Sequence, residues 1–132
     1  MNITLTQAEK VIEAAKRKAA AIDTKMDICV VDTGANLTAF ARMDGAWLGS
    51  VDISIKKAKT AMYFTMDTEQ LSPLVQPGAP LYNIEHSNQG LITFPGGLVL
   101  KNQEGTILGA IGVSGSTVED DREVAKAGAE AL

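Results

Sequence analysis

The 132-residue chain is poor in the residues that cross-link or metallate small proteins, with one cysteine, Cys29, and one histidine, His86. A single cysteine excludes a disulfide within the chain, and the two residues cannot form a Cys/His zinc site alone. No apolar run approaches the roughly 20 residues that cross a bilayer. The N-terminal MNITLTQAEK lacks the basic and apolar segments of a signal peptide. We therefore expect a soluble cytoplasmic protein with no membrane partner.

Excess positive charge is also missing. Lys and Arg total 12 against 16 Asp and Glu, which gives a net charge of -4. The chain lacks the basic footprint of nucleic-acid-binding proteins, so DNA or RNA is not an expected partner. With 45% hydrophobic and 21% charged residues, the composition is typical of a globular domain. A domain of this length buries about two thirds of its unfolded surface and holds a core without a disulfide or metal.

Apolar residues at helical spacing predict helices at both ends of the chain. The first is expected over residues 6–21, where Thr6 and Glu9 have the spacing of a capping box. The last is expected from residue 118 to the end, behind a second capping box of Ser116 and Glu119. Between them, we expect a helix capped by Ser50 and a short helix over residues 67–75 capped by Asp67.

Five segments have the β-branched or alternating pattern of strands. They are residues 26–31, 37–42, 91–94, 98–101 and 106–113. The turn-forming run Asp32–Asn36 joins the first two into a hairpin, and hairpins imply an antiparallel sheet. Gly109 and Gly112 inside the last strand are typical of a bulge or of close approach by another group. We therefore predict one domain, residues 1–132, with an α/β (α+β) sandwich fold: a five-stranded antiparallel sheet packed with helices.

The irregular stretch 76–88 is the first candidate for a functional loop, because long loops in compact domains are commonly functional. It carries Tyr82, Glu85 and His86. An imidazole can ligate iron or act as a general base. The alternative is a surface histidine held by hydrogen bonds. Cys29 lies in an apolar strand, where a cysteine behaves as a small hydrophobe, and a nucleophilic Cys29–His86 pair would require the two to meet in space.

Several other groups suit a ligand, and each also has a purely structural explanation. Four cations could receive carboxylates or could lie on a solvated helix face: Arg42, Lys56, Lys57 and Lys59. The backbone of Gly96 and Gly97 could approach a ligand or could form a bend in the sheet. Residues 109–117 resemble a phosphate cradle, but they lack a P-loop lysine, and acids at 119–121 would repel an anion. We expect a plain capped helix there.

Six runs of residues in order resemble one known family over nearly the whole chain. The runs are 30–37 (VVDTGANL), 41–46 (ARMDGA), 54–61 (SIKKAKTA), 76–82 (QPGAPLY), 94–97 (FPGG) and 109–115 (GAIGVSG). They resemble the GlcG/HbpS-like family, often labelled a haem-degrading domain, which includes the C-terminal domain of PduO-type proteins.

The resemblance implies a profilin- or PAS-like sandwich and a dimer-based homo-oligomer, such as a tetramer or octamer. It also implies binding of haem, a corrinoid or another small molecule. Haem-binding members have been associated with a histidine on the first helix or a threonine in the loop before the Gly-Gly turn. Here residues 6–21 contain no histidine, and the loop has Ala79 and Pro80 near the threonine position. His86, Tyr82 or Met43 would have to ligate the iron instead.

Three hypotheses follow. In the first, haem or a related tetrapyrrole binds between the 76–88 loop, the 95–97 turn and the second helix, and can be degraded there. His86 is the metal ligand, Tyr82, Gly96 and Gly97 line the site, and Arg42 or Lys59 faces the propionates. In the second, a cofactor-free enzyme acts on a small carboxylate or hydroxylated metabolite of a glycolate or diol pathway, with His86 or Glu85 as catalytic base. In the third, the chain is a non-catalytic oligomeric sensor or assembly module.

Overall fold

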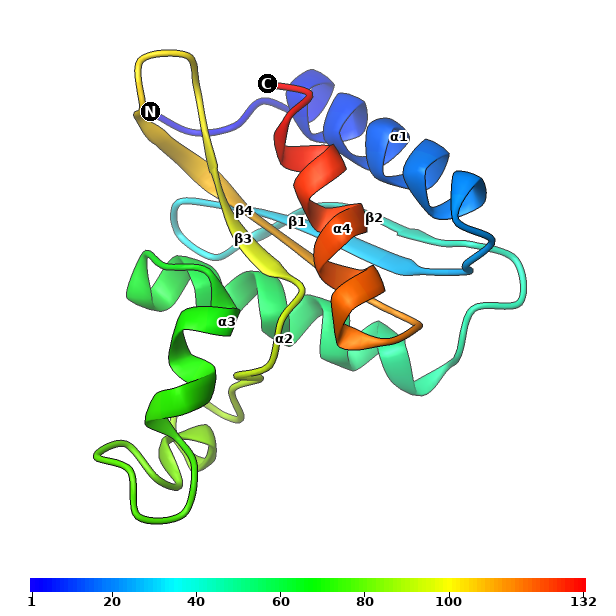
Figure 1. Ribbon diagram of the computed structural model, residues 1–132. Coiled ribbons are helices and arrows are strands. Elements are labelled where there is room, and N and C mark those ends of the chain that lie inside the picture. The colour runs from blue at the N-terminus through cyan, green and yellow to red at the C-terminus, as the bar shows by residue number, and fades with distance from the viewer.

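The centre of the fold is a four-stranded antiparallel sheet with strand order β2-β1-β4-β3. The computed structural model describes residues 1–132. Its strands are β1 (Asp27–Asp32), β2 (Leu37–Arg42), β3 (Gly97–Lys101) and β4 (Ile107–Ser114). Helices α1 (Leu5–Ala21) and α4 (Val118–Ala129) lie side by side on one face, and α2 (Gly49–Phe64) covers the other (Figure 1). None of the helices has both the length and the apolar character for a membrane crossing.

The segment between α2 and β3 projects from one end of the sheet (Figure 1). It contains α3 (Thr68–Leu71) and two 3₁₀ turns, η1 (Ser72–Leu74) and η2 (Ile84–His86). Short-range backbone hydrogen bonds hold this segment beyond α3. The Leu81 N–H, for example, donates to the Leu74 carbonyl at 2.9 Å. The long irregular loop predicted from the sequence is therefore a series of tight turns.

The prediction of a fifth strand at residues 91–94 is wrong. The backbone there is satisfied by side chains of neighbouring helices in place of a strand. The Ile92 N–H donates to the Thr60 hydroxyl at 3.2 Å, and the Phe94 carbonyl accepts from the Thr68 hydroxyl at 2.8 Å. A short apolar segment without a ladder partner packs as an extended connection.

Three predicted helix caps lie at different residues. The N-cap of α1 is Thr4, which forms a capping box with Gln7 in place of Thr6 with Glu9. Thr117 caps α4 instead of Ser116, and α2 begins after Leu48 with no side-chain cap. At α1 and α4, nearby hydroxyl residues are nearly equivalent as caps, so the tertiary path of the chain selects between them.

Two apolar layers form the core, one on each side of the sheet. Alternate residues of β1 point to opposite faces, so Ile28 and Val30 pack against α1 and α4, while Cys29 and Val31 pack against α2. The α2 layer is thin because a Cβ at Gly112 on β4 would overlap the Ser54 carbonyl of α2. The close approach expected at Gly112 is thus confirmed, and it brings α2 directly onto the sheet.

Candidate functional site

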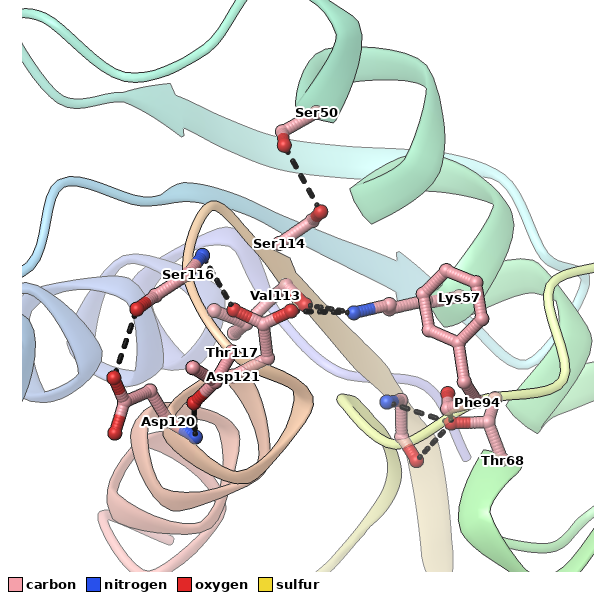
Figure 2. A network of polar contacts seen from close by, with 11 residues as sticks. Ser50, Lys57, Thr68, Phe94, Val113, Ser114, Ser116, Thr117, Asp120 and Asp121 are labelled. Atoms are coloured by element: carbon pink, nitrogen blue, oxygen red, sulfur yellow. Dashed lines mark hydrogen bonds and ion pairs between the residues drawn. The ribbon is translucent and has the colours of Figure 1, made fainter. Parts of the chain in front are cut away.

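The largest fully buried side chain of the protein is Lys57, on the sheet-facing side of α2. Its Nζ donates to the Val113 carbonyl and to Asp121 Oδ2, each at 2.8 Å. The ammonium also lies 4.8 Å from the centroid of the Phe94 ring (Figure 2). The solvated position considered for Lys57 is therefore wrong: three groups from distant segments enclose its charge.

The carboxylate that pairs with Lys57 is itself fixed by backbone. Asp121 Oδ1 accepts from the Ser116 N–H at 3.0 Å, so the start of α4 is tied to the ion pair. Burial lowers the pKa of the Lys57 ammonium and raises the pKa of the Asp121 carboxyl, while the charge of each partner opposes the effect of burial. Of the acids at 119–121, Asp121 therefore has its partners inside the protein.

Packing around Lys57 explains the Pro95-Gly96-Gly97 turn. Gly96 has φ +129°, and a Cβ there would lie 2.6 Å from the Lys57 Nζ. A Cβ at Gly97 would lie 2.6 Å from the Thr68 Cγ2. Of the two explanations for these glycines, the bend is the one with contacts in the structure, and neither glycine lines a cavity.

The residues predicted for a ligand site do not form a single cluster. His86 and Tyr82 are exposed on the projecting segment, outside every cavity. Glu85 is half-buried, and its Oε1 has no hydrogen-bond partner. Arg42 and Lys59 line two different cavities. The fold of one chain therefore provides no single site at which a ligand would contact all of these residues.

Cys29 is fully buried beside α2, whereas His86 is exposed. Burial raises the pKa of the Cys29 thiol to about 12, with a small opposing effect from the Lys59 charge. A thiol of this kind is protonated at neutral pH and is a poor nucleophile. The structure therefore contradicts a Cys29–His86 nucleophilic pair.

Asp27, at the start of β1, is a second buried acid that sequence reasoning missed. Neither of its carboxylate oxygens has a hydrogen-bond partner. In the sheet register it lies between Arg42 on β2 and Ser114 on β4. Burial raises the pKa of the Asp27 carboxyl, and the Arg42 charge acts in the opposite direction. In the sequence, the run Met-Asp-Ile-Cys at residues 26–29 looks like any strand that begins with an exposed acid, so it does not show that Asp27 is buried.

The largest cavity, of about 570 Å³, lies between α1 and β2 and is called here the α1–β2 cavity. Its lining is Lys16, Ala20, Asp23, Thr24, Lys25, Ala41, Arg42, Met43 and Asp44. Three of these residues are cations and two are acids. A neighbouring cavity of about 450 Å³ shares residues 23–25 with it and adds the exposed Trp47. This end of the sheet is therefore hollowed and carries a small excess of positive charge.

A smaller cavity of about 220 Å³ lies between the outer face of α2 and the turn at residues 88–90. It is called here the α2 groove. Its lining is Asp52, Ile55, Lys56, Lys59, Tyr63, Asn88, Gln89 and Gly90. Two lysines one turn apart on α2 thus face a polar turn that belongs to the projecting segment.

The fold and its cavities define a class: a small α+β domain whose antiparallel sheet lies between helices and which carries cationic cavities at its surface. Within that class, residues 3–130 match the model of the family described as haem degrading protein HbpS-like. The chain belongs to this HbpS-like family, as the resemblance of its sequence runs indicated.

Relatives support this assignment. The chain is 44% identical over 126 residues to an uncharacterized 15.0 kDa protein of the dhaT–dhaS intergenic region of Citrobacter freundii, covering 94% of this chain and 87% of that protein. It is 35% identical over 133 residues to the corrinoid adenosyltransferase PduO of the same organism, covering 100% of this chain but 39% of PduO. Among solved structures, a PduOC:heme complex has a TM-score of 0.93 and 32% identity, covering 100% of this chain and 96% of that chain.

Proposed function

We propose that the protein binds haem or a related tetrapyrrole and that the α1–β2 cavity is the site. The observation that carries the proposal is the cavity itself. Its volume of about 570 Å³ lies within the range of small-molecule and cofactor sites. The family description and the haem complex of a relative with 32% identity support the choice of ligand.

The charges around the α1–β2 cavity fit the carboxylates of such a ligand. Haem carries two propionates, and Lys16, Lys25 and Arg42 line the cavity. Arg42 donates from Nε and Nη2 to the Ala46 carbonyl at 3.3 and 3.1 Å, which leaves Nη1 for a ligand. Asp23 and Asp44 limit the excess of positive charge in the cavity. Because salt screens the attraction between the remaining positive charge and the propionates, we expect binding to weaken as the salt concentration rises.

Met43 is the soft donor in the lining, and thioethers are established haem ligands. Its Sδ already accepts from the Met26 N–H at 3.4 Å, which orients the side chain. We propose Met43 as a ligand and keep His86 as the competing one. Bound haem iron would supply redox chemistry, while the protein's own residues would hold the carboxylates and ligate the iron. We also propose that the bound haem can be broken down at this site.

The test is a titration of the purified protein with hemin, with a cobalamin in parallel, followed by absorbance. We expect saturable binding with a shifted absorption band, weakened about tenfold by Arg42→Gln through loss of a charge-assisted contact. Met43→Leu should alter the band, whereas His86→Ala should not. If His86→Ala alone abolished the band, the site would lie on the projecting segment. No binding of either ligand would overturn the proposal. Loss of the band after adding a reductant in air would reveal degradation.

We also propose that the protein forms a homo-oligomer built from dimers. Strand β2 is an uncovered edge of the sheet, and such edges readily pair with another chain. Trp47 and Leu48, just beyond it, are 65% and 76% exposed. Apolar groups of this size on a surface favour an interface. The mass of the protein in solution gives the number of subunits.

One observation favours a second function, the cofactor-free enzyme. Glu85 Oε1 is buried without a hydrogen-bond partner, so it could accept a proton from a substrate once a movement of the projecting segment exposes it. We would assay the haem-free protein against small hydroxy acids. The proposal requires turnover that Glu85→Gln removes, with His86→Gln as the comparison. Turnover that survives both changes would exclude either residue as the base.

A further inference from the structure

We propose that the α2 groove binds a small oxyanion, either a carboxylate of a few carbons or inorganic phosphate. The groove is separate from the α1–β2 cavity and shares no lining residue with it. The inference therefore does not rest on haem binding. It uses the cations of α2 and the backbone of the turn that faces them.

The α2 wall of the groove carries one lysine without an acidic partner. On the α2 wall, Lys56 Nζ lies 3.0 Å from Asp52 Oδ2, so that lysine has an acidic partner. Lys59, one turn further along, is half-buried in the same wall and forms no ion pair. A half-buried ammonium without a counter-charge attracts an anion more strongly than an exposed one, because water screens it less. The groove thus has one uncompensated positive charge.

The turn opposite Lys59 carries free backbone donors. Asn88, Gln89 and Gly90 all have positive φ, at 52°, 61° and 104°. The Gly90 N–H donates to the Ser87 carbonyl at 2.9 Å, but the N–H groups of Asn88 and Gln89 have no acceptor within the protein. Successive free amides in a turn form a concave anion-binding surface. Two backbone donors therefore belong to the turn that lines the groove.

The two walls of the groove lie close together at Gly90. A Cβ at Gly90 would lie 3.1 Å from the Lys56 Nζ, so the absence of a side chain there lets the lysine lie against the turn. Asp52 neutralises Lys56 without reaching Lys59. The Tyr63 side chain, which also lines the groove, carries a hydroxyl that can donate to an anion. Ammonium, amide and phenol donors together match the oxygens of a carboxylate or phosphate.

The size of the groove suits a small anion. At about 220 Å³, the groove holds the equivalent of roughly seven water molecules at ~30 Å³ each. That volume accepts phosphate or a short hydroxy acid. It is below the roughly 300 Å³ at which pockets for drug-sized ligands begin, so a tetrapyrrole does not fit inside it.

The experiment follows the backbone amide signals of the ¹⁵N-labelled protein by NMR during separate titrations with sodium phosphate and sodium lactate at constant ionic strength. We expect saturable shifts centred on Asn88 and Gln89. Lys59→Gln should weaken binding about tenfold, as loss of one charge-assisted contact predicts. Lys101→Gln, an equal loss of charge on β3 outside every cavity, is the matched control and should leave the affinity unchanged.

The outcomes separate this site from the haem site. Saturation by phosphate alone or by lactate alone identifies the anion and supports the proposal. Absence of saturable shifts with both, or an equal weakening by Lys59→Gln and Lys101→Gln, overturns it. Hemin titration of Lys59→Gln should match that of the wild type, so a failure of haem binding and a failure of oxyanion binding are distinguishable.

Discussion

At the scale of single residues, burying the Lys57–Asp121 ion pair costs a large desolvation free energy, and close polar contacts compensate for it. Removing two charges from water costs several kcal/mol per ion, and only close, complete contacts repay it. Here the ammonium has a carbonyl, a carboxylate and an aromatic face around it, and the carboxylate has a backbone amide. Because the contacts come from α2, β4 and α4, the pair specifies how these elements meet.

Replacing one member of the pair should be far worse than replacing both. Lys57→Met leaves the Asp121 carboxylate buried with half its partners, and breaking a buried pair typically costs about 3–5 kcal/mol. The double variant Lys57→Met/Asp121→Leu should recover most of that loss, because no charge remains buried. Urea unfolding of Lys57→Met, Asp121→Leu and the double variant measures these losses. Additive losses in the double variant would show that the two residues do not act as a pair.

The buried, unpaired carboxyl of Asp27 predicts that the stability of the protein depends on pH. Because burial raises its folded-state pKa above the unfolded value, the folded protein takes up a proton first, and the stability linked to Asp27 rises as pH falls through the folded pKa. Asp27→Asn removes the buried charge, so it should stabilise the protein by about 1 kcal/mol at pH 7. This advantage should shrink toward pH 4.

Urea unfolding at several pH values tests this behaviour, with the exposed Asp44→Asn as a control that should change nothing. If Asp27→Asn were less stable than the wild type at pH 7, the attraction of the Arg42 charge would outweigh the cost of burying the Asp27 carboxylate.

At the scale of elements, α2 lies unusually close to the sheet because small groups face one another. Ser54, Ala58 and Ala61 on the helix are fully buried, and Gly112 on β4 lies under them. Such close packing leaves no space for an added methyl group, since interiors are packed like organic crystals. The same approach brings Lys57 within reach of the Val113 carbonyl.

Gly112→Ala should therefore be strongly destabilising. Its Cβ would meet backbone atoms of α2 that cannot move independently, and overpacking of this kind costs about 1–3 kcal/mol or more. Gly49→Ala, in the first turn of the same helix, meets nothing within 4 Å and should be neutral or slightly stabilising. Thermal unfolding of both variants provides the comparison. Equal stability of the two would mean that α2 can shift away from β4 without loss.

At the scale of the whole molecule, one edge of the sheet is covered and the other is not. At the β3 edge, the Val99 N–H donates to Asp67 Oδ1 at 3.1 Å, so the segment before α3 covers it. At the β2 edge no element follows, and Leu37 is exposed there as well as Trp47 and Leu48 beyond it. This asymmetry is the physical basis for the proposed dimer, because an uncovered edge and apolar side chains lie in adjacent stretches of chain.

Sedimentation velocity should give a mass above the 13.9 kDa of one chain. Trp47→Glu/Leu48→Glu places two charges in the proposed interface and should shift the protein to a monomer, since buried unpaired charges are costly. Leu5→Glu, another exposed apolar residue but at the start of α1, is the matched control and should not change the mass. A monomeric wild type, or a double variant that sediments like it, would contradict the proposal.

Much of the fold could be predicted because its signals are local. Helix periodicity located the buried stripe of α1, and the Asp32–Asn36 turn predicted the hairpin of β1 and β2, with its antiparallel pairing. These patterns reflect which face of an element is apolar, and a short window of residues contains that information. The 91–94 segment shows the limit, because whether an apolar run pairs as a strand depends on a neighbour elsewhere in the chain.

By itself, the sequence determined the antiparallel α+β class, the terminal helices, the absence of an internal disulfide and the family resemblance. Only the tertiary structure decided that Lys57 is buried, because its partners Val113 and Asp121 lie 56 and 64 residues away. It also decided that Arg42 and Lys59 line separate cavities. In a sequence, a lysine on a helix looks the same whether its charge is solvated by water or paired with a distant carboxylate. The free energy that distinguishes the two comes from desolvation and long-range contacts, which exist only once the chain has folded.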